Sequence, residues 1–328
     1  MSRYQNLLTI AIPTYNRSSK LIRLLEILLD EINLNNLPEV KIIISDNCST
    51  DDTETKVNNY LIKNSNIKYF RQKSNLGFDN NILFLYNKCN SEYIWFFSDD
   101  DYPFVGSLKR VHDGLLNNKP DIILFSFMQP PGSKKRQFNF SEKIKVINDS
   151  AEIITNVLAM PKLTIYVLKK TLFNETLNKI HISSIGEGWM FLMLALSVLE
   201  SSINSKVAIF SDQLATSDDD FKHIWIPTPF LYIYKIAKHP FIKKNQPKLE
   251  YTLKASGYYQ CILFSWAIKV GALTVDDNIG LNKFIEDLDF RFFTLAKKPK
   301  IFFMLLLMKA DLVPFLLTLK RSFNKFYL

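Results

Sequence analysis

The stretch Tyr93-Ile-Trp-Phe-Phe-Ser-Asp-Asp-Asp-Tyr-Pro103 is an apolar run that ends in three adjacent carboxylates. Its apolar half has the β-branched and aromatic content of a buried strand. We therefore expect Asp99, Asp100 and Asp101 to emerge at the carboxyl end of that strand, the edge at which open α/β sheets bind ligands. Neighbouring like charges repel one another and lose hydration when a site closes over them, which favours a cation among them.

A divalent metal ion is the cation that this cluster predicts. Mg²⁺ and Mn²⁺ typically take one or two protein carboxylates and complete their shells with water and substrate phosphates. The alternative is an acidic turn before a helix that begins near Gly106 and Ser107, because Asp is also favoured at helix amino ends. The segments on either side of the cluster favour the metal.

Strands and helices alternate over the first 127 residues. The predicted strands are Leu7–Ile12, Val40–Ser45, Ile67–Arg71, Tyr93–Ser98 and Asp121–Phe127. Four helices are predicted: one that begins at Ser18 or Ser19, one from a cap at Thr50 to Lys63, one over Asp79–Cys89 and one over Ser107–Asn117. In the first helix Leu21, Leu24, Leu25, Leu28 and Ile32 recur at helical spacing. Single helices between strands imply right-handed crossovers and a parallel sheet with helices on both faces. The polar loops 13–17, 46–52 and 99–101 should then meet at one edge.

The usual phosphate-binding motifs are absent from this layout. The chain has 9 glycines and contains neither GxGxxG after the first strand nor GxxxxGK[ST], so neither a dinucleotide-binding fold nor a P-loop is supported. A metal held by the acidic cluster would bind the phosphates instead. Asp46, at the end of the second strand, can accept hydrogen bonds from a base or ribose.

Four motifs in this region resemble, in order and position, those of the family 2 glycosyltransferases of GT-A fold. They are Ile12-Pro-Thr-Tyr-Asn-Arg17, Ser45-Asp-Asn-Cys-Ser-Thr-Asp51, Asn75-Leu-Gly-Phe-Asp-Asn-Asn81 and Phe97-Ser-Asp-Asp-Asp-Tyr102. They are most similar to the subgroup that contains O-antigen abequosyltransferases. The resemblance covers about 130 residues and implies an α/β GT-A fold, a mostly parallel Rossmann-like sheet with flanking helices, and an inverting transfer of a sugar from a nucleoside diphosphate.

The resemblance also implies roles for single residues. The donor pocket would be lined by Pro13, Tyr15, Arg17, Asp46, Asn75, Gly77 and Asp99, with Asp46 at the base and Asp99 near the ribose. Asp100 and Asp101 would ligate the metal, with Asp100 as the principal carboxylate of the DxD equivalent. Ser98 stands where many members have the first acid, so a register that pairs Asp99 with Asp101 stays open.

The segment after residue 128 has a different pattern. Residues 1–128 are expected to form the nucleotide-sugar half of the domain, 129–225 the acceptor half, and 226–328 a helical extension. A helix over Ser150–Met160 and strands over Leu163–Lys169 and Val207–Phe210 are predicted.

Glu187 is the candidate general base. Family members often carry a Glu-Asp pair at the start of the following apolar helix, which we expect to run to Leu199, and here the pair reads Glu187-Gly188. A glutamate that only stabilises the helix amino end is the alternative role. His181 and His223 are alternative bases, and Asp218-Asp-Asp220 is interpreted as a solvated loop.

Composition and charge suggest the compartment and the partners. The three cysteines, Cys48, Cys89 and Cys261, are too few and too far apart for a disulfide framework, and the first residues contain no signal segment, so a cytosolic protein is expected. No apolar run approaches the ~18 residues of a membrane span. Lys297–Leu328 holds 7 basic residues and 1 acid of a chain with net charge +9, in an amphipathic pattern that predicts binding to a membrane interface. No nucleic-acid recognition motif accompanies this charge.

Together these observations predict a glycosyltransferase that uses Mn²⁺ or Mg²⁺ and lies on the inner face of the bacterial cell membrane. Its donor would be a nucleoside diphosphate sugar, with deoxyhexoses among the candidates, and its acceptor a lipid-linked oligosaccharide of O-antigen or another surface polysaccharide. A nucleotidyltransferase of related topology lacks its glycine-rich signature here. A non-catalytic sugar- or membrane-binding module is the alternative from another class. The sequence does not predict an oligomeric state.

Overall fold

The structure, a computed structural model, describes residues 6–217, 223–224, 233–249 and 274–275. The chain divides into two compact units, Met1–Asp218 with His239–Gln246, and Asp219–Lys238 with Pro247–Leu328. In the second unit the described elements are β10 (His223–Ile224), the 3-10 helix η2 (Ile233–Lys238) and β11 (Thr274–Val275). The second acidic triplet, the His223 side chain and the basic tail lie outside what is described, as does most of the predicted helical region 226–328.

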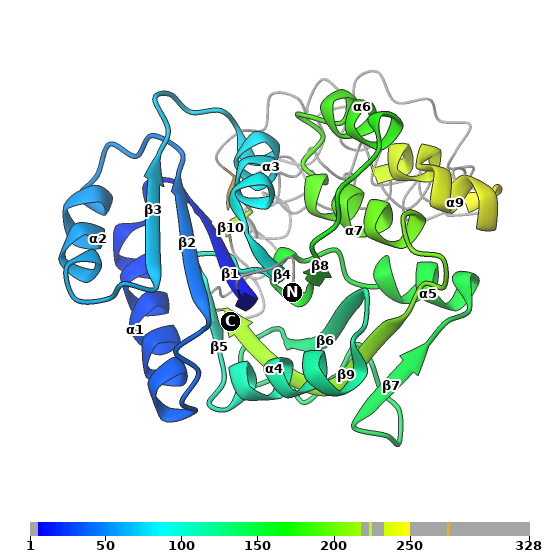
Figure 1. The fold of residues 1–328 in the computed structure, drawn as a ribbon, viewed down its shortest axis with the longest axis horizontal. Helices are drawn as coiled ribbons and strands as arrows, with labels where there is room; N and C mark the ends of the chain where they lie inside the picture. The colour runs from blue at the N-terminus through cyan, green and yellow to red at the C-terminus, as the bar shows by residue number, and fades with distance from the viewer. Residues whose placement is uncertain (1–5, 218–222, 225–232, 250–273, 276–328) are drawn as a thin grey trace, which may run out of the picture. The chain divides into compact units, whose positions relative to one another are not determined.

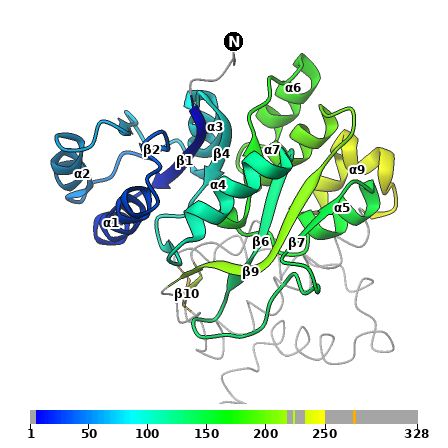
Figure 2. The same cartoon turned by 60° about the horizontal axis from the view of Figure 1, so that its bottom comes forward.

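The first half of the larger unit is a parallel sheet with helical crossovers (Figure 1). Its elements are β1 (Asn6–Thr14), α1 (Ser18–Leu34), β2 (Lys41–Asp46), α2 (Thr53–Leu61), β3 (Ile67–Arg71), α3 (Phe78–Lys88) and β4 (Ser91–Phe96). The strand order is β3-β2-β1-β4, all in parallel pairs. Because the chain reverses direction across the sheet after β3, right-handed crossovers place α1 and α2 on one face and α3 on the other, as Figures 1 and 2 show.

The second half completes a nine-stranded mixed sheet. It contributes β5 (Asp101–Pro103), α4 (Ser107–Asn118), β6 (Ile122–Met128), β7 (Ile144–Ile147), α5 (Ser150–Val157), the 3-10 helix η1 (Leu163–Ile165), β8 (Val167–Lys169), α6 (Glu175–Ser183), α7 (Met190–Glu200), β9 (Val207–Ser217) and α9 (Pro240–Asn245). The order continues β4-β8-β6-β9-β5, with β8 antiparallel to both neighbours and β7 paired to β9. The predicted donor half 1–128 and acceptor half 129–225 therefore share one sheet, and the division between them stays a functional prediction.

The core beneath the acidic cluster is aromatic and closely packed. Trp95 is fully buried and packs against Phe97 in a tilted arrangement and against Phe125 edge-on, at centroid distances of 5.1 and 5.7 Å. It donates its indole N–H to the carbonyl of Thr164 at 2.8 Å. Such rings contribute a large apolar area, and the indole hydrogen bond satisfies the buried polar atom. The core therefore fixes the end of β4, from which the three carboxylates continue.

Several boundary predictions are corrected by the structure. The second helix begins at Thr53 with Asp52 as its cap residue, because Thr50 instead hydrogen-bonds Asn16 in the neighbouring loop. The strand predicted over Leu163–Lys169 is split into η1 and the short β8. The apolar helix α7 begins at Met190, so Glu187 lies in the loop before it and outside its first turn.

Candidate active site

The loops that follow β1 and β2 are joined by hydrogen bonds at the carboxyl edge of the sheet. The backbone N–H of Asn16 donates to Ser49 Oγ at 2.8 Å, and Asn16 Oδ1 accepts from the Thr50 N–H at 2.7 Å. The Ser18 N–H donates to Asp51 Oδ2 at 3.1 Å. Asn16 has φ of 52°, a left-handed conformation that Asn tolerates better than most residues. The predicted meeting of these loops is confirmed.

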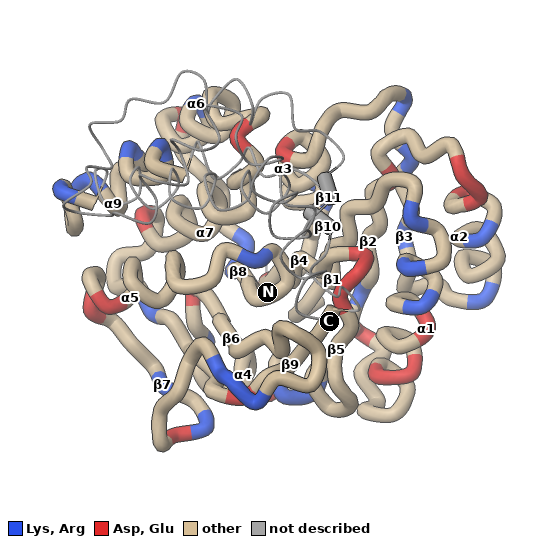
Figure 3. The backbone as a smooth tube through the Cα atoms, turned by 180° about the vertical axis from the view of Figure 1, so that it is seen from behind, with Lys and Arg blue, Asp and Glu red and all other residues tan. Residues whose placement is uncertain are grey.

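The third loop joins them through the acidic triplet, which continues from β4 into β5 (Figure 3). Arg17 Nη1 lies 3.0 Å from Asp99 Oδ1 and 2.8 Å from Asp100 Oδ2. The hydroxyl of Thr14 donates to the other oxygen of Asp99 at 2.8 Å, and that of Ser98 donates to Asp100 Oδ1 at 2.6 Å. One guanidinium therefore bridges two of the three carboxylates that the sequence placed together.

The environments of these two carboxyls differ. Burial raises the pKa of Asp99 to about 6, against the lowering effect of the Arg17 charge. Burial would also raise the pKa of Asp100, but the Arg17 charge and the Ser98 hydrogen bond hold it below its usual value. The Asp100 side chain keeps 16% of its surface exposed and that of Asp99 only 5%. Asp100 is therefore the more accessible and the more readily ionised of the pair.

Asp101 is paired with a different cation from that of Asp99 and Asp100. Its carboxylate has no exposed surface, lies 3.0 Å from Lys162 Nζ and accepts the hydroxyl of Thr164. Burial raises its pKa to about 6, although the Lys162 charge opposes this. Lys162 Nζ also lies 4.3 Å from the centre of the Phe127 ring. Lys162 comes from the loop before η1, far along the chain, and sequence reasoning did not identify it.

The fit of a divalent metal differs between the two predicted ligands. Each Asp100 oxygen accepts one hydrogen bond and retains a second lone pair, and the side chain is partly exposed, which leaves a hard cation access to it. Asp101 would first have to lose its ion pair with Lys162. Among the residues that the structure describes, no group of three or more His, Cys, Asp or Glu could hold a metal. Asp100 therefore fits a site completed by substrate phosphates and water better than an all-protein cage.

Asp46 lies at the end of β2, where it was predicted, and is fully buried. It accepts the Tyr69 hydroxyl at 2.6 Å and the Ser49 N–H at 2.8 Å, while Arg71 Nε lies 3.8 Å away. Burial and the hydrogen bond to Asp46 raise the pKa of Tyr69. Tyr69 and Arg71 were not identified from the sequence, although both lie in a strand that pairs with β2 at its carboxyl end.

Asn75 and Gly77 lie in the loop before α3, where Asn75 bonds the Gly77 N–H and the side chain of Asn47. Asn47 Nδ2 donates to Asn75 Oδ1 at 2.7 Å, and the Leu76 N–H donates to Asn47 Oδ1 at 2.8 Å. Gly77 has φ of 79°, a conformation that L side chains rarely adopt, and it precedes α3 as its cap residue. Pro13 lies near the end of β1, opposite Ser45.

The predicted base, Glu187, lies between Gly186 and Gly188 and is 8% exposed. Its backbone N–H donates to the Ser184 carbonyl at 3.2 Å. The alternative base His181 is 1% exposed and bonds the hydroxyl of Ser197 at 2.8 Å, in the interior between α6 and α7.

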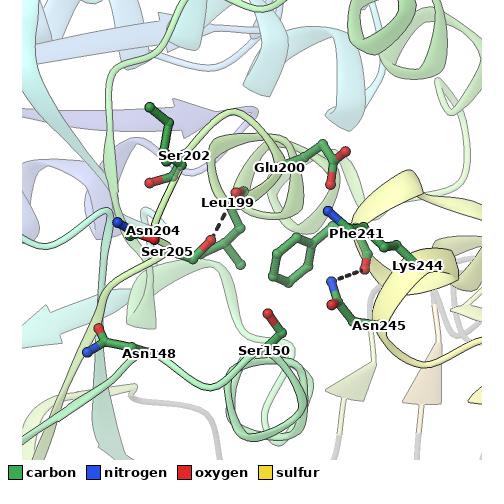
Figure 4. Close-up of a pocket in the computed structure, with 11 residues that line it drawn as sticks. Asn148, Ser150, Leu199, Glu200, Ser202, Asn204, Ser205, Phe241, Lys244 and Asn245 are labelled. Carbon is green, nitrogen blue, oxygen red and sulfur yellow. Dashed lines mark hydrogen bonds between the residues drawn. The ribbon is translucent and has the colours of Figure 1, made fainter.

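One cavity of about 220 Å³ lies elsewhere in the same unit and contains none of the predicted site residues (Figure 4). It is lined by residues of α7, the loop that follows it and α9, including Glu200, Ser205 and Asn245. The Asn245 side chain donates to the Phe241 carbonyl, so it is already used within its own helix. The strand-end loops, rather than this cavity, carry the candidate chemistry.

No helix within the described part of the chain is long and apolar enough to cross a membrane. Curated relatives match parts of the chain. It is 38% identical over 122 residues to the abequosyltransferase RfbV of Salmonella typhimurium, an alignment that covers 36% of this chain and 35% of the relative. It is 28% identical over 137 residues to a GalNAc(5)-diNAcBac-PP-undecaprenol beta-1,3-glucosyltransferase of Campylobacter jejuni, covering 40% and 42%. The matches thus span well under half of either relative.

Solved structures support the fold. TarS residues 1–349 of S. aureus superimpose with a TM-score of 0.56 at 16% identity, covering 97% of this chain and 91% of that one. The same protein in complex with UDP-GlcNAc gives a TM-score of 0.57 at 17% identity and covers 97% and 92%. The sequence model described as Glycosyl transferase family 2 matches residues 9–182, more than half of the chain. The predicted GT-A fold is therefore confirmed, and the chain belongs to the glycosyl transferase family 2.

Proposed function

We propose that this protein is an inverting glycosyltransferase that moves a sugar from a nucleoside diphosphate to a lipid-linked saccharide. The observation that carries the proposal is the convergence of three strand-end loops. Arg17 of the loop after β1 bridges Asp99 and Asp100, and Asn16 of the same loop hydrogen-bonds Ser49 of the loop after β2. Membership of the family supports the reaction class. The two curated relatives are an abequosyltransferase and an undecaprenol-linked glucosyltransferase, which supports sugar transfer.

The donor would lie along the carboxyl edge of β1, β2 and β4. We assign its contacts to Pro13, Tyr15, Arg17, Asp46, Asn75, Gly77 and Asp99. Tyr15 is 37% exposed in the same loop as Arg17, where it would give the base an aromatic surface. Arg17 carries a guanidinium of the kind that binds phosphate or carboxylate oxygens through paired N–H groups.

Mn²⁺ or Mg²⁺ would be held by Asp100, with Asp101 as the second predicted ligand. When bound, such an ion neutralises charge on the diphosphate as it departs. Asp100 would hold the ion at the carboxyl end of β4 while Asp99, through Thr14 and Arg17, keeps the two loops together. This division of roles follows the greater exposure of the Asp100 side chain.

Glu187 would act as the base. Its carboxylate takes the proton of the acceptor hydroxyl as that oxygen bonds to the anomeric carbon, and the bond from that carbon to the diphosphate oxygen breaks on the opposite face. The nucleoside diphosphate leaves with the electron pair, and the anomeric configuration inverts. The glycines on either side of Glu187 have no side chains that would block the approach of a sugar.

The lipid-linked acceptor and the position at the inner face of the cell membrane are parts of the same proposal. They are supported by the undecaprenol in the name of one relative and by the basic, amphipathic sequence of Lys297–Leu328, which lies outside the described residues. Deoxyhexose donors are among the candidates because the other relative is named as an abequosyltransferase.

A panel of UDP-, CDP-, GDP- and TDP-linked sugars, screened by thermal unfolding with and without Mn²⁺, tests the proposal. A donor at 100 times its dissociation constant should add about 2.7 kcal/mol to the free energy of unfolding. The stabilising donor should also release its nucleoside diphosphate, and Glu187→Gln should slow that release by roughly 10²- to 10⁴-fold without weakening donor binding. Stabilisation without turnover of any donor would instead support a non-catalytic sugar-binding module.

A further inference from the structure

Asp79 is a buried carboxylate that the proposed reaction does not use directly. It lies in the first turn of α3, two residues after Gly77, and only 3% of its surface is exposed. Its oxygens accept three backbone N–H groups from the segment that contains Glu187: Gly186 at 2.8 Å, Gly188 at 2.7 Å and Met190 at 3.1 Å. A charged group from the donor side of the sheet therefore binds the loop that carries the candidate base.

The backbone of that loop is shaped to bind an anion. Gly186 has φ of 91° and Gly188 of 77°, and these left-handed conformations let successive N–H groups converge on one carboxylate. Met190 is the first residue of α7, which has no acidic residue in its first turn and no side-chain cap of its own. Asp79 thus supplies the negative charge that the amino end of this helix favours.

A second contact reinforces the first. Phe78, adjacent to Asp79, packs edge-on against Phe191 of α7 at a centroid distance of 6.5 Å. On the other side, Gly77 N–H donates to Asn75 Oδ1, and Asn75 in turn binds Asn47 at the end of β2. A continuous set of contacts therefore runs from the β2 loop through Asn75 and Asp79 to the segment that holds Glu187.

We propose that Asp79 is a positioning residue that fixes the Gly186–Gly188 loop, and with it Glu187, relative to the donor loops. This inference rests on the proposed role of Glu187 as the base. Without the hydrogen bonds from the Gly186, Gly188 and Met190 N–H groups to Asp79, the Glu187 carboxylate can move relative to the acceptor hydroxyl. Displacements of about 1 Å in catalytic groups cost roughly 10²-fold in rate. We expect donor binding to persist without these three hydrogen bonds, because the N–H groups that the Asp79 carboxylate accepts, those of Gly186, Gly188 and Met190, are not among the assigned donor contacts.

The first test is independent of activity. Hydrogen exchange of the backbone amides of Gly186, Gly188 and Met190 should accelerate in Asp79→Asn, because an amide offers one acceptor oxygen in place of two. Asp121→Asn is the matched control: Asp121 is also buried and accepts the Lys206 N–H and the Ser202 hydroxyl at 2.9 Å each, but at the amino end of β6, the opposite edge of the sheet. Unchanged exchange at the three amides in Asp79→Asn overturns the proposal.

The second test is a double-mutant cycle on donor hydrolysis, in which water replaces the acceptor. The probe is the panel donor that stabilises the protein most. Asp79→Asn should lower kcat about 10²-fold with the donor Kd unchanged by calorimetry, while in the Glu187→Gln background the same substitution should change kcat less than about twofold. Effects that multiply in full overturn the positioning role while leaving Glu187 as the base.

A Glu187→Gln variant with near-wild-type hydrolysis would instead remove the base assignment, and the positioning role with it. Gly186→Ala is a second variant that tests the proposal even if Asp79→Asn fails to fold. An added Cβ there meets no atom within 4 Å, so it disturbs the left-handed backbone without disturbing packing. It should reproduce the loss in kcat and the coupling to Glu187; wild-type kcat in Gly186→Ala would contradict the proposal.

Discussion

Acidification should destabilise the larger unit through a buried histidine pair. His181 of α6 and His239, the cap residue of α9, bond the same hydroxyl, Ser197 Oγ of α7, at 2.8 and 2.9 Å. The Phe241 N–H donates to His239 Nδ1 at 3.3 Å. His239 must then carry its proton on Nε2 and donate to Ser197, which in turn donates to His181 Nε2, so both imidazoles are neutral. Protonation of either imidazole at its accepting nitrogen would break one of these hydrogen bonds.

The magnitude follows from the pKa values. Burial lowers the pKa of His181 from 6.5 to about 4, and burial with the nearby His181 lowers that of His239 to about 3. Between these values and 6.5 the unfolded chain binds more protons than the folded one, so stability is full above pH 6.5 and is lost as the pH falls. Each histidine contributes a slope of up to about 1.4 kcal/mol per pH unit. From pH 7 to 5 the pair should cost about 4 kcal/mol.

Urea unfolding at pH 7, 6 and 5 measures this loss as a falling midpoint at constant m. The comparison that isolates it is with His181→Gln/His239→Gln, whose absolute stability is lower but whose decline between pH 7 and 5 should be shallower. His112→Gln, which removes the imidazole of α4 that pairs with Glu39, should keep the steep decline. The same pH slope in wild type and in the double variant would refute the reasoning.

Three further predictions concern the site, a helix cap and the tail. Asp100→Asn should abolish metal-stimulated donor turnover in a variant that still folds cooperatively in urea, because the residue lies in a loop; full turnover in that variant, or activity unaffected by EDTA, would exclude its metal role. Glu31→Gln should lower stability by about 1–3 kcal/mol, since Glu31 is buried and accepts the N–H groups of Gly106 and Leu108 at the start of α4; exposed Glu26→Gln on the same helix is the control, and equal urea midpoints for the two variants would contradict this. Deleting Leu312–Leu328 should weaken binding to anionic liposomes by roughly 1 kcal/mol per Lys or Arg removed, as measured by sedimentation, and undiminished binding would favour a tail packed on the protein.

Much of the donor half could be predicted because its determinants are local. The strand Ile67–Arg71 was predicted with its observed bounds, and α1 follows from the helical spacing of its apolar residues. The carboxyl ends of parallel strands meet at one edge, so the convergence of the loops around Arg17 and Asp99 followed from strand order alone. Helix starts were less predictable. A hydrogen bond between Thr50 and the neighbouring loop moves the start of α2, and the loop bound by Asp79 delays the start of α7 until after Glu187.

The sequence by itself determined the strand–helix alternation, the acidic cluster at the end of β4 and the family, since these depend on residue type and spacing along short segments. Only the tertiary structure decided which groups face the cluster. Lys162 pairs with Asp101 and Tyr69 bonds Asp46 across the sheet, while Asp79 binds the loop of Glu187 more than 100 residues away. No spacing rule connects Lys162 with Asp101 or Asp79 with the Glu187 loop, because these contacts depend on how the segments around β8 and α7 pack beside β4 and α3. The physical reason is that a buried charge is costly unless it is paired, and its partner is a group that tertiary packing places beside it, however distant in sequence.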